Sequence, residues 1–301
     1  MMLLAKKSLR GRVLGLLVFL QSALIVTGGS VRLTGSGLGC PTWPECTPGS
    51  YVPVANQAEG QLHAWIEFGN RLLTFVLLIC ALAVVTFSVR VSKNAANKER
   101  VRSLAALQIL GIFGQGMLGG VTVLTDLHPL TVAAHYLLSI LLIAGAISLR
   151  YELIGTPVEK TTGLISFLMP IFVWLTFLVL VAGTIVTGSG PHAGDEKAER
   201  FGFDPQVVSW IHADLVIALI VIAVMLLLIA HQSGMSLLVR RIGIFLLIAF
   251  SQGVIGYIQY FTGLPEALVA AHLIGSTLVW GSVWSIAKIS NSGFRVQGLR
   301  R

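Results

Sequence analysis

The sequence predicts an all-α integral membrane protein whose eight transmembrane helices form two parallel, pseudo-symmetric four-helix bundles. Three observations support this fold class. The 301 residues are 55% hydrophobic and only 11% charged, with a mean hydropathy of +0.84, unlike a soluble domain. Eight apolar runs are long enough to span a bilayer of roughly 30 Å, which takes about 20 residues each. The chain also repeats a set of residues at a constant offset of 137 positions.

The boundaries of the apolar runs justify each predicted helix in order. The first run follows a basic N-terminal segment and ends at residues 34–37, Thr-Gly-Ser-Gly. The second, third, fifth and seventh lie between polar or glycine-containing segments. The fourth, sixth and eighth begin beside Pro129, Pro205 and Pro265, since proline suits the first helical turn. Each run must be helical, because backbone groups in hydrocarbon need partners within their own segment. The predicted helices cover residues 13–33, 61–89, 103–125, 129–149, 164–187, 206–230, 238–261 and 265–288.

Two parts of the chain repeat one another. Residues 115–139 contain Gln-Gly, then Ala-Ala-His and Ser, and residues 252–276 contain the same residues at the same spacing. The first and fifth runs both end in Thr-Gly-Ser-Gly. We therefore predict two domains, residues 1–152 and residues 153–301. Each has an even number of helices, so both run in the same direction through the membrane.

The basic residues predict the orientation. All but four of the 21 Lys and Arg residues lie at the termini or in the even-numbered connections. The four exceptions are Arg32, Arg71, Lys197 and Arg200. By the positive-inside rule, both termini are cytoplasmic, and we expect a bacterial inner membrane. The basic residues are split among short loops, which argues against nucleic-acid binding.

Four histidines lie in apolar segments and are candidate metal ligands: His63, His135, His212 and His272. The last three lie about 9–11 Å along their helices from the prolines that precede them. Two imidazoles on facing helices can bind a haem iron from both sides. A single buried histidine is more often a hydrogen-bonded core residue, but four in two symmetric pairs favour haem. A bare zinc or copper ion is disfavoured, because no nearby residue in the sequence supplies a third or fourth ligand of the expected type.

Glu67 is the candidate catalytic residue. His63, Glu67 and Asn70 are spaced four and three residues apart and share one helix face. A carboxylate near a bound ligand can accept or donate protons. The alternative is structural, because Glu67 can pair with Arg71 four residues later. The second half of the chain has no counterpart, so one half is equipped for chemistry and the other for holding a cofactor.

Cys40 and Cys46 lie in the long loop after the first helix, on the predicted oxidising side of the membrane. We expect a disulfide between them. Its function is either to hold the loop over the first site or to exchange electrons with the site or a thioredoxin-like partner. The matching loop at residues 188–205 has no cysteine.

These motifs resemble the haem A synthase family, in its CtaA-like, actinobacterial form. The segments concerned are Thr-Gly-Ser-Gly-Leu-Gly-Cys-Pro-x-Trp-Pro-x-Cys at 34–46, Ile-Glu-Phe-Gly-Asn-Arg at 66–71 and the paired Ala-Ala-His. The resemblance implies oxidation of the C8 methyl of haem O to a formyl group through hydroxylated intermediates. It implies haem B between His212 and His272, and substrate haem O or product haem A in the N-terminal half beside Glu67. It also implies haem O synthase, terminal oxidase assembly and a quinone or thioredoxin-like protein as partners, in a lipid membrane.

One departure from the family pattern concerns the iron ligands. Many members have histidine where this chain has Asn70, which is a poor iron ligand. His63 is one candidate substitute, and ligation by His135 alone is the other. Two other functions compete: a di-haem electron carrier of the cytochrome b type without covalent chemistry, and a transporter whose histidines relay protons.

Overall fold

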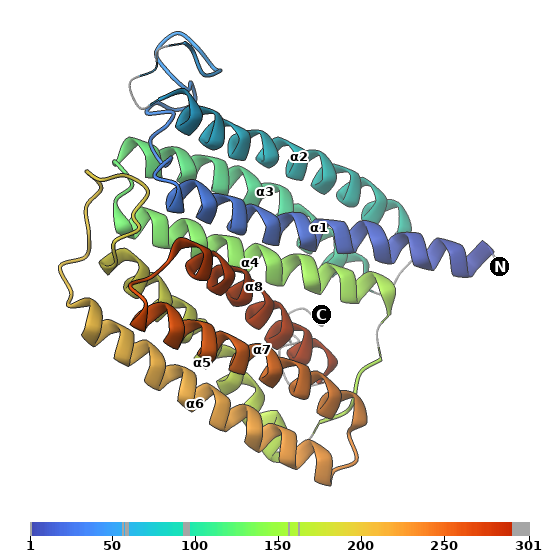
Figure 1. Ribbon diagram of the computed structural model, residues 1–301. Coiled ribbons are helices and arrows are strands. Elements are labelled where there is room, and N and C mark those ends of the chain that lie inside the picture. The colour runs from blue at the N-terminus through green and yellow to red at the C-terminus, as the bar shows by residue number, and fades with distance from the viewer. Residues whose placement is uncertain are drawn as a thin grey trace. The chain divides into compact units, whose positions relative to one another are not determined.

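The computed structural model describes residues 2–55, 57, 60–92, 97–155, 157–161 and 163–290, with side chains from residue 10 onward. These residues form eight α-helices and no β-strand (Figure 1). In chain order they are α1 (Met2–Leu33), α2 (Gln61–Val91), α3 (Lys98–Leu124), α4 (Pro129–Ile154), α5 (Gly163–Ser189), α6 (Pro205–Gln232), α7 (Ser236–Phe261) and α8 (Glu266–Ile289).

All eight helices are long and apolar enough to cross a membrane, which confirms the predicted fold class. Many of their large apolar side chains are exposed, including Phe19, Ile79 and Leu247. Such a surface is unfavourable in water but matches lipid tails. The chain is therefore a multi-pass membrane protein. The first helix begins at Met2, earlier than predicted, because the preceding Leu, Ala and Lys residues are good helix formers.

The chain divides into two compact units. The first consists of Met1–Ile154 with Thr184–Pro205, and the second of Gly155–Gly183 with Gln206–Arg301. The segment that ends α5 and leads to α6 thus groups with the first four helices. The division at residue 152 and the pseudo-symmetry of the bundles stay predictions. The basic residues Arg295, Arg300 and Arg301, used to predict orientation, lie outside the described part.

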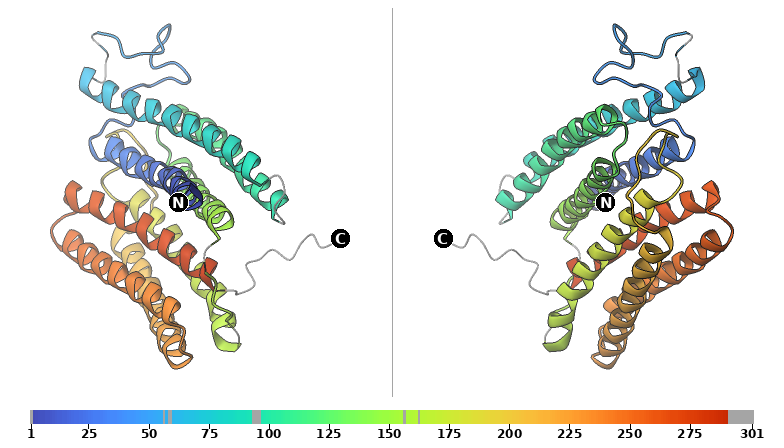
Figure 2. Two further views of the ribbon diagram at one scale, coloured as in Figure 1. Left: turned by 90° about the vertical axis from the view of Figure 1, so that its right-hand side faces the viewer. Right: turned by 90° about the vertical axis from the view of Figure 1, so that its left-hand side faces the viewer.

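The first unit is a ring of four helices. Helix α1 packs against α2 and α4, and α3 packs against the same two helices. Helices α2 and α4 therefore lie across the ring from each other, as the views in Figure 2 allow the reader to follow. Small and branched residues fill its core, among them Leu14, Ala81, Val84, Ala105 and Leu149.

Inside this apolar ring lies a buried pair of amides. Gln21 of α1 donates from Nε2 to Oε1 of Gln108 on α3, at 3.1 Å. Gln108 in turn donates to the carbonyl oxygen of Leu142 on α4, at 3.1 Å. Buried polar groups in a membrane protein need such partners, so this chain of bonds ties three helices together.

The second unit is joined by aromatic contacts. Phe172 of α5 meets Phe245 of α7 edge to face, with ring centroids 4.9 Å apart. Phe177 of α5 lies 6.2 Å from Trp280 of α8, and α7 packs along α8. At the start of α7, the carboxylate of Glu159 accepts hydrogen bonds from the Leu237 and Leu238 amides at 3.1 and 3.0 Å. A carboxylate at a helix N-terminus complements the helix dipole.

Candidate functional site

Three of the four predicted histidines lie against a glycine of the preceding helix. The pairs are Gly119 with His135, Gly183 with His212, and Gly256 with His272. A Cβ atom on these glycines would lie 3.2, 3.4 and 3.5 Å, respectively, from the Cε1 atom of the histidine. The distance at Gly119 is tighter than most real Cβ contacts, and the other two are ordinary van der Waals distances, so each imidazole packs directly on the glycine. The three glycines lie five or six residues before the ends of α3, α5 and α7, so the three pairs hold corresponding positions in their own helices.

The fourth pair of this kind contains no histidine. Gly28 lies five residues before the end of α1, and a Cβ atom on it would be 3.8 Å from Nδ2 of Asn70 on α2. The Thr27 hydroxyl lies 2.8 Å from Oδ1 of Asn70 and donates to it. In the packing of the helices, Asn70 thus occupies the place that histidine takes in the other three pairs.

His63 lies in a different place. It is the third residue of α2, seven residues before Asn70 and so about 10 Å away along the helix axis. Its Nδ1 atom is 2.8 Å from the Ser36 hydroxyl, and its ring borders a cleft formed by loops. The structure does not bring His63 to the level of the glycine contacts. Its role as an iron ligand stays a prediction.

The imidazole nitrogens are suited to an added ligand. His212 has its Nδ1 atom 3.1 Å from the carbonyl oxygen of Val179, a bond that would leave Nε2 free to bind a metal. The Nδ1 atoms of His135 and His272 are buried without a hydrogen-bond partner among the described residues. The three partly buried imidazoles therefore fit a haem iron, which takes its protein ligands from one or two histidines.

The repeated glutamines, Gln115 and Gln252, contact the helices that carry His135 and His272. Gln115 donates from Nε2 to the carbonyl oxygen of His135 at 3.0 Å and to the Ser139 hydroxyl at 2.7 Å. In the second unit, the amide group of Gln252 lies directly against Gly275, and a Cβ atom there would overlap it unless the Gln252 side chain moved. The repeated Gln, His and Ser residues thus fix the spacing of two neighbouring helices as well as marking a ligand site.

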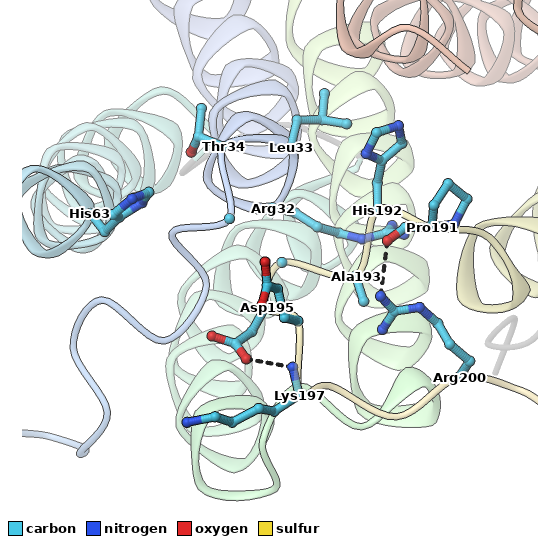
Figure 3. A pocket seen from close by; sticks show the side chains of 13 residues that line it. Arg32, Leu33, Thr34, His63, Pro191, His192, Ala193, Asp195, Lys197 and Arg200 are labelled. Carbon is cyan, nitrogen blue, oxygen red and sulfur yellow. Dashed lines mark hydrogen bonds between the residues drawn. The ribbon is translucent and has the colours of Figure 1, made fainter. Parts of the chain in front are cut away.

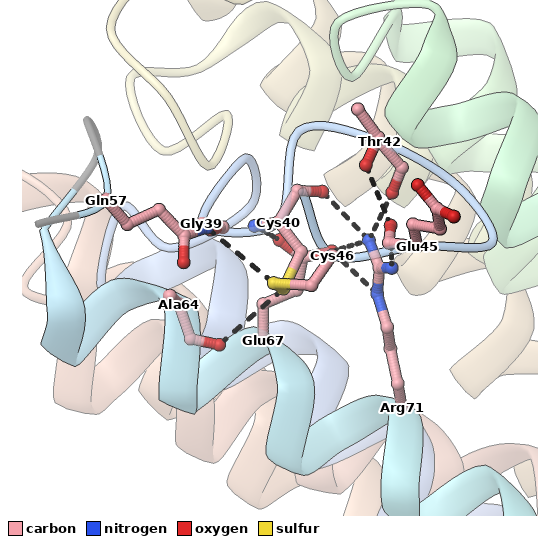
Figure 4. Close-up of polar contacts among 9 residues, drawn as sticks. All are labelled: Gly39, Cys40, Thr42, Glu45, Cys46, Gln57, Ala64, Glu67 and Arg71. Atoms are coloured by element: carbon pink, nitrogen blue, oxygen red, sulfur yellow. Dashed lines mark hydrogen bonds and ion pairs between the residues drawn. A yellow bond between two sulfur atoms is a disulfide. The ribbon is translucent and has the colours of Figure 1, made fainter. Parts of the chain in front are cut away.

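Glu67 is buried, with 6% of its surface exposed, and both of its carboxylate oxygens are occupied (Figure 4). Oε1 forms an ion pair with Arg71 at 2.5 Å, and Oε2 accepts the backbone N–H of Cys40 at 2.6 Å. The pairing that competed with a catalytic role is therefore present. The catalytic role itself stays a prediction.

Arg71 joins α2 to the loop that carries the cysteines. Besides Glu67, its guanidinium donates to the carbonyl oxygens of Cys40, Thr42 and Glu45 at 2.8, 3.1 and 3.2 Å. Figure 4 shows these bonds converging from one side of the loop on a single side chain. A guanidinium has five N–H donors in a fixed plane, and no other side chain could satisfy so many carbonyls at once.

The predicted disulfide between Cys40 and Cys46 is present, and both residues are completely buried. The amide of Gln57 donates to the carbonyl oxygen of Gly39 and to Sγ of Cys46. The ring of Trp43 packs on Gly120 of α3, where a Cβ atom would come within 2.5 Å of it. The loop is thereby fastened over the end of the four-helix ring, at Glu67.

A cleft of about 740 Å³ lies between the end of α1, the start of α2 and the loop after α5 (Figure 3). Its lining includes Arg32 and His63 from the first four helices, and His192, Asp195, Glu196, Lys197 and Arg200 from the loop after α5. The guanidinium of Arg32 donates to the carbonyl oxygen of Thr187 at 2.8 Å, and that of Arg200 donates to the carbonyl oxygen of Pro191 at 2.9 Å. Within the described part of the chain, neither guanidinium forms an ion pair, so both can receive an added carboxylate.

Sequence reasoning missed several of these residues. Arg32 and Arg200 carried a signal, as basic residues on the side predicted to be poor in them. Thr27 and Gln57 carried none, because their partners lie far along the chain. No group of three or more His, Cys, Asp or Glu residues within the described ranges is arranged to bind a bare metal ion.

Comparison with known proteins places these features in a family. The family model described as Cytochrome oxidase assembly protein, COX15-CtaA, matches residues 11–194. The chain is 30% identical over 127 residues to the Heme A synthase of Geobacillus thermodenitrificans, covering 42% of this chain and 37% of the relative. It is 29% identical over 147 residues to the Heme A synthase of Bacillus licheniformis, which covers 48% of this chain and 44% of the relative. It is 28% identical over 204 residues to the Heme A synthase of Methylorubrum populi, which covers 54% of this chain and 52% of the relative. The chain thus spans less than two thirds of the length of these relatives.

Proposed function

The chain belongs to the COX15-CtaA family of cytochrome oxidase assembly proteins, and on this premise we propose that it is a haem A synthase. It would oxidise the C8 methyl group of haem O to a formyl group through hydroxylated intermediates. The observation that carries the proposal is the set of three histidines that pack on glycines at corresponding helix positions, one in the first unit and two in the second. Bound haem would supply the redox chemistry, and the protein would supply ligands, orientation and proton transfer.

We assign the two units different tasks. His212 and His272 would bind haem B, since the two imidazoles lie against glycines on neighbouring helices of the same unit. His135 would bind the substrate haem in the first unit, which also holds Glu67 and the disulfide loop. The carboxylate is present in one unit only, so covalent chemistry is expected there.

Glu67 would hold or move a proton beside the substrate. Oε1 accepts two hydrogen bonds from Arg71, whereas Oε2 accepts one, from the Cys40 amide, so the second lone pair of Oε2 would hold the proton. The loop above Glu67 would exclude water, because the disulfide and Gln57 seal it. Arg71 would orient the carboxylate through its own bonds to the loop carbonyls.

The cleft would receive the carboxylate groups of the substrate. Haem carries two propionates, and guanidinium groups bind carboxylates with paired hydrogen bonds. Arg32 and Arg200 have no competing ion pair in the described structure, and Lys197 lies on the same lining. Asp195 and Glu196 also line the cleft and would limit its attraction for other anions.

We further propose the cell context. The eight spans and the bacterial relatives make this a multi-pass bacterial membrane protein. The distribution of basic residues supports an inner membrane with both termini in the cytoplasm. The disulfide loop would then lie on the oxidising side. Haem O would come from a haem O synthase, haem A would pass to terminal oxidase assembly, and electrons would leave to a quinone or a thioredoxin-like partner.

The proposal is tested by pigment extraction from membranes that contain this chain and a source of haem O. We expect haem A with the unaltered protein, and a loss of at least about 100-fold in its rate of formation with Glu67→Gln, the usual size of a proton-transfer contribution. Glu266→Gln changes an exposed glutamate of α8 and serves as the matched control. Bound haem B without any haem A would instead identify an electron carrier, and absence of any haem would favour a transporter.

A further inference from the structure

Three of the four glycine contacts involve a histidine that could bind iron, and the fourth involves a residue that could not. At three of them the glycine faces a histidine, and at the fourth Gly28 faces Asn70. All four glycines lie five or six residues before the ends of α1, α3, α5 and α7. Asn70 therefore holds the position in its helix pair, against a glycine, where each of the other three pairs has an imidazole.

Asn70 also faces the correct direction within its unit. It belongs to α2 and His135 to α4, and these helices lie across the four-helix ring from each other. The glycines that they contact belong to α1 and α3, the other two members of the ring. A flat ligand bound to His135 would thus have Asn70, rather than a second imidazole, on the helix opposite.

The chemistry of the asparagine side chain prevents it from replacing histidine. Its Oδ1 atom is engaged by the Thr27 hydroxyl at 2.8 Å. Its Nδ2 atom carries two hydrogens and has no lone pair to offer a metal. No acceptor among the described residues takes a hydrogen bond from Nδ2, so this atom remains a free donor beside Gly28.

We propose that Asn70 leaves one axial position open at the first-unit haem, which His135 alone would hold, and directs its amide N–H groups toward that position. The inference rests on the proposed function, because it assumes that both units bind haem. It distinguishes the two units: His212 and His272 would hold a closed haem with two histidine ligands, whereas the first-unit haem would accept small added ligands. Asn70 would act as a positioning residue for such a ligand.

Ferric haem spin state tests this proposal without measuring haem A formation. In the His212→Ala/His272→Ala variant, haem B added to the purified full-length chain can use only the first unit. We expect a high-spin spectrum in absorption and electron paramagnetic resonance, and a change on adding imidazole or cyanide. Adding Asn70→His to this variant should convert the haem to low-spin and abolish the change. The converse substitution, His212→Asn in the unaltered chain, should turn the second-unit haem from low-spin to high-spin.

The unaltered protein provides a check that needs no folding of a variant. Loaded with two haems, it should show one low-spin and one high-spin haem, and only the latter should bind carbon monoxide in the ferrous state. A low-spin first-unit haem overturns the proposal, and its conversion to high-spin by His63→Ala would assign the second ligand to His63. Failure of the first unit to bind haem in the unaltered protein overturns both this inference and the proposed substrate site. A low-spin haem there overturns the inference alone.

Discussion

At the scale of single residues, Glu67 and Arg71 connect chemistry to structure. Arg71 bonds to one carboxylate and three loop carbonyls, so the position of Glu67 depends on the position of the loop. A pair of this kind, once buried, is costly to break, because a charge would be left without a partner. The same contacts that stabilise the loop therefore set the carboxylate that we assign to proton transfer.

Two glycines of α3 allow the effect of packing on stability to be measured apart from the effect of helix propensity. Gly120→Ala should lower the free energy of unfolding by about 1–3 kcal/mol, since its Cβ would overlap the Trp43 ring, and overpacking costs this much. Gly116→Ala is the matched control, because nothing lies within 4 Å of its Cβ. It should be neutral or stabilise by up to about 1 kcal/mol through helix propensity. Thermal unfolding in detergent measures both, and equal effects would contradict the described loop position.

At the scale of helices and loops, the two units use different contacts in the same role. Gln108 of α3 lies 137 residues before Phe245 of α7, the offset of the repeat. Gln108 hydrogen-bonds to Gln21 of α1, whereas Phe245 packs edge to face on Phe172 of α5. A polar bridge in one unit thus stands where the other has an aromatic pair. Both join the third helix of their unit to the first.

A double-mutant cycle tests the amide bridge. Gln21→Leu or Gln108→Leu alone should destabilise the protein by about 1–3 kcal/mol, because each leaves a buried amide with one partner fewer. The double variant should recover part of this loss, with a coupling energy of about 0.6–2 kcal/mol. Unfolding in a denaturing detergent gives the four values. Strictly additive effects would show that the two amides do not interact.

The disulfide loop should unfold before the helices when its bond is removed. Cys40→Ala/Cys46→Ala opens a ring with a sequence separation of 6, which costs roughly 2 kcal/mol by chain entropy. We expect faster proteolysis within residues 40–50 and an unchanged helix content by circular dichroism. Cys80→Ala, which removes the free cysteine of α2, is the control. If the loop were cleaved no faster than in the unaltered protein, the contacts of Arg71 and Gln57 would be sufficient to hold it in place without the disulfide.

At the scale of the whole molecule, the distribution of charge predicts orientation. A reporter that is fluorescent only in the cytoplasm should be active when fused to the C-terminus. The same reporter inserted after Gly49, in the disulfide loop, should be inactive, because that loop is predicted to lie on the opposite side. The reverse pattern of activity would show that the topology is inverted and that the disulfide loop does not lie on the oxidising side.

Much of this architecture could be predicted, because the properties that specify it are local. The eight helices follow from the length and hydropathy of each run, and the disulfide follows from two cysteines six positions apart in a loop. The ion pair of Glu67 with Arg71 follows from helical spacing, and the sequence predicts it as the structural alternative to a catalytic role. These features need no knowledge of which helix contacts which.

The remaining features depend on segments that are distant in the chain. The bond from Thr27 to Asn70 and the packing of Trp43 on Gly120 appear only when separate helices and loops come together. The sequence by itself determined an eight-helix membrane protein with a repeated histidine motif and a disulfide-closed loop. The tertiary structure decided that Asn70, and not His63, packs on a glycine of the preceding helix as the other three histidines do. Hydropathy and helical period act along the chain, whereas the surface that a side chain meets is made by another helix.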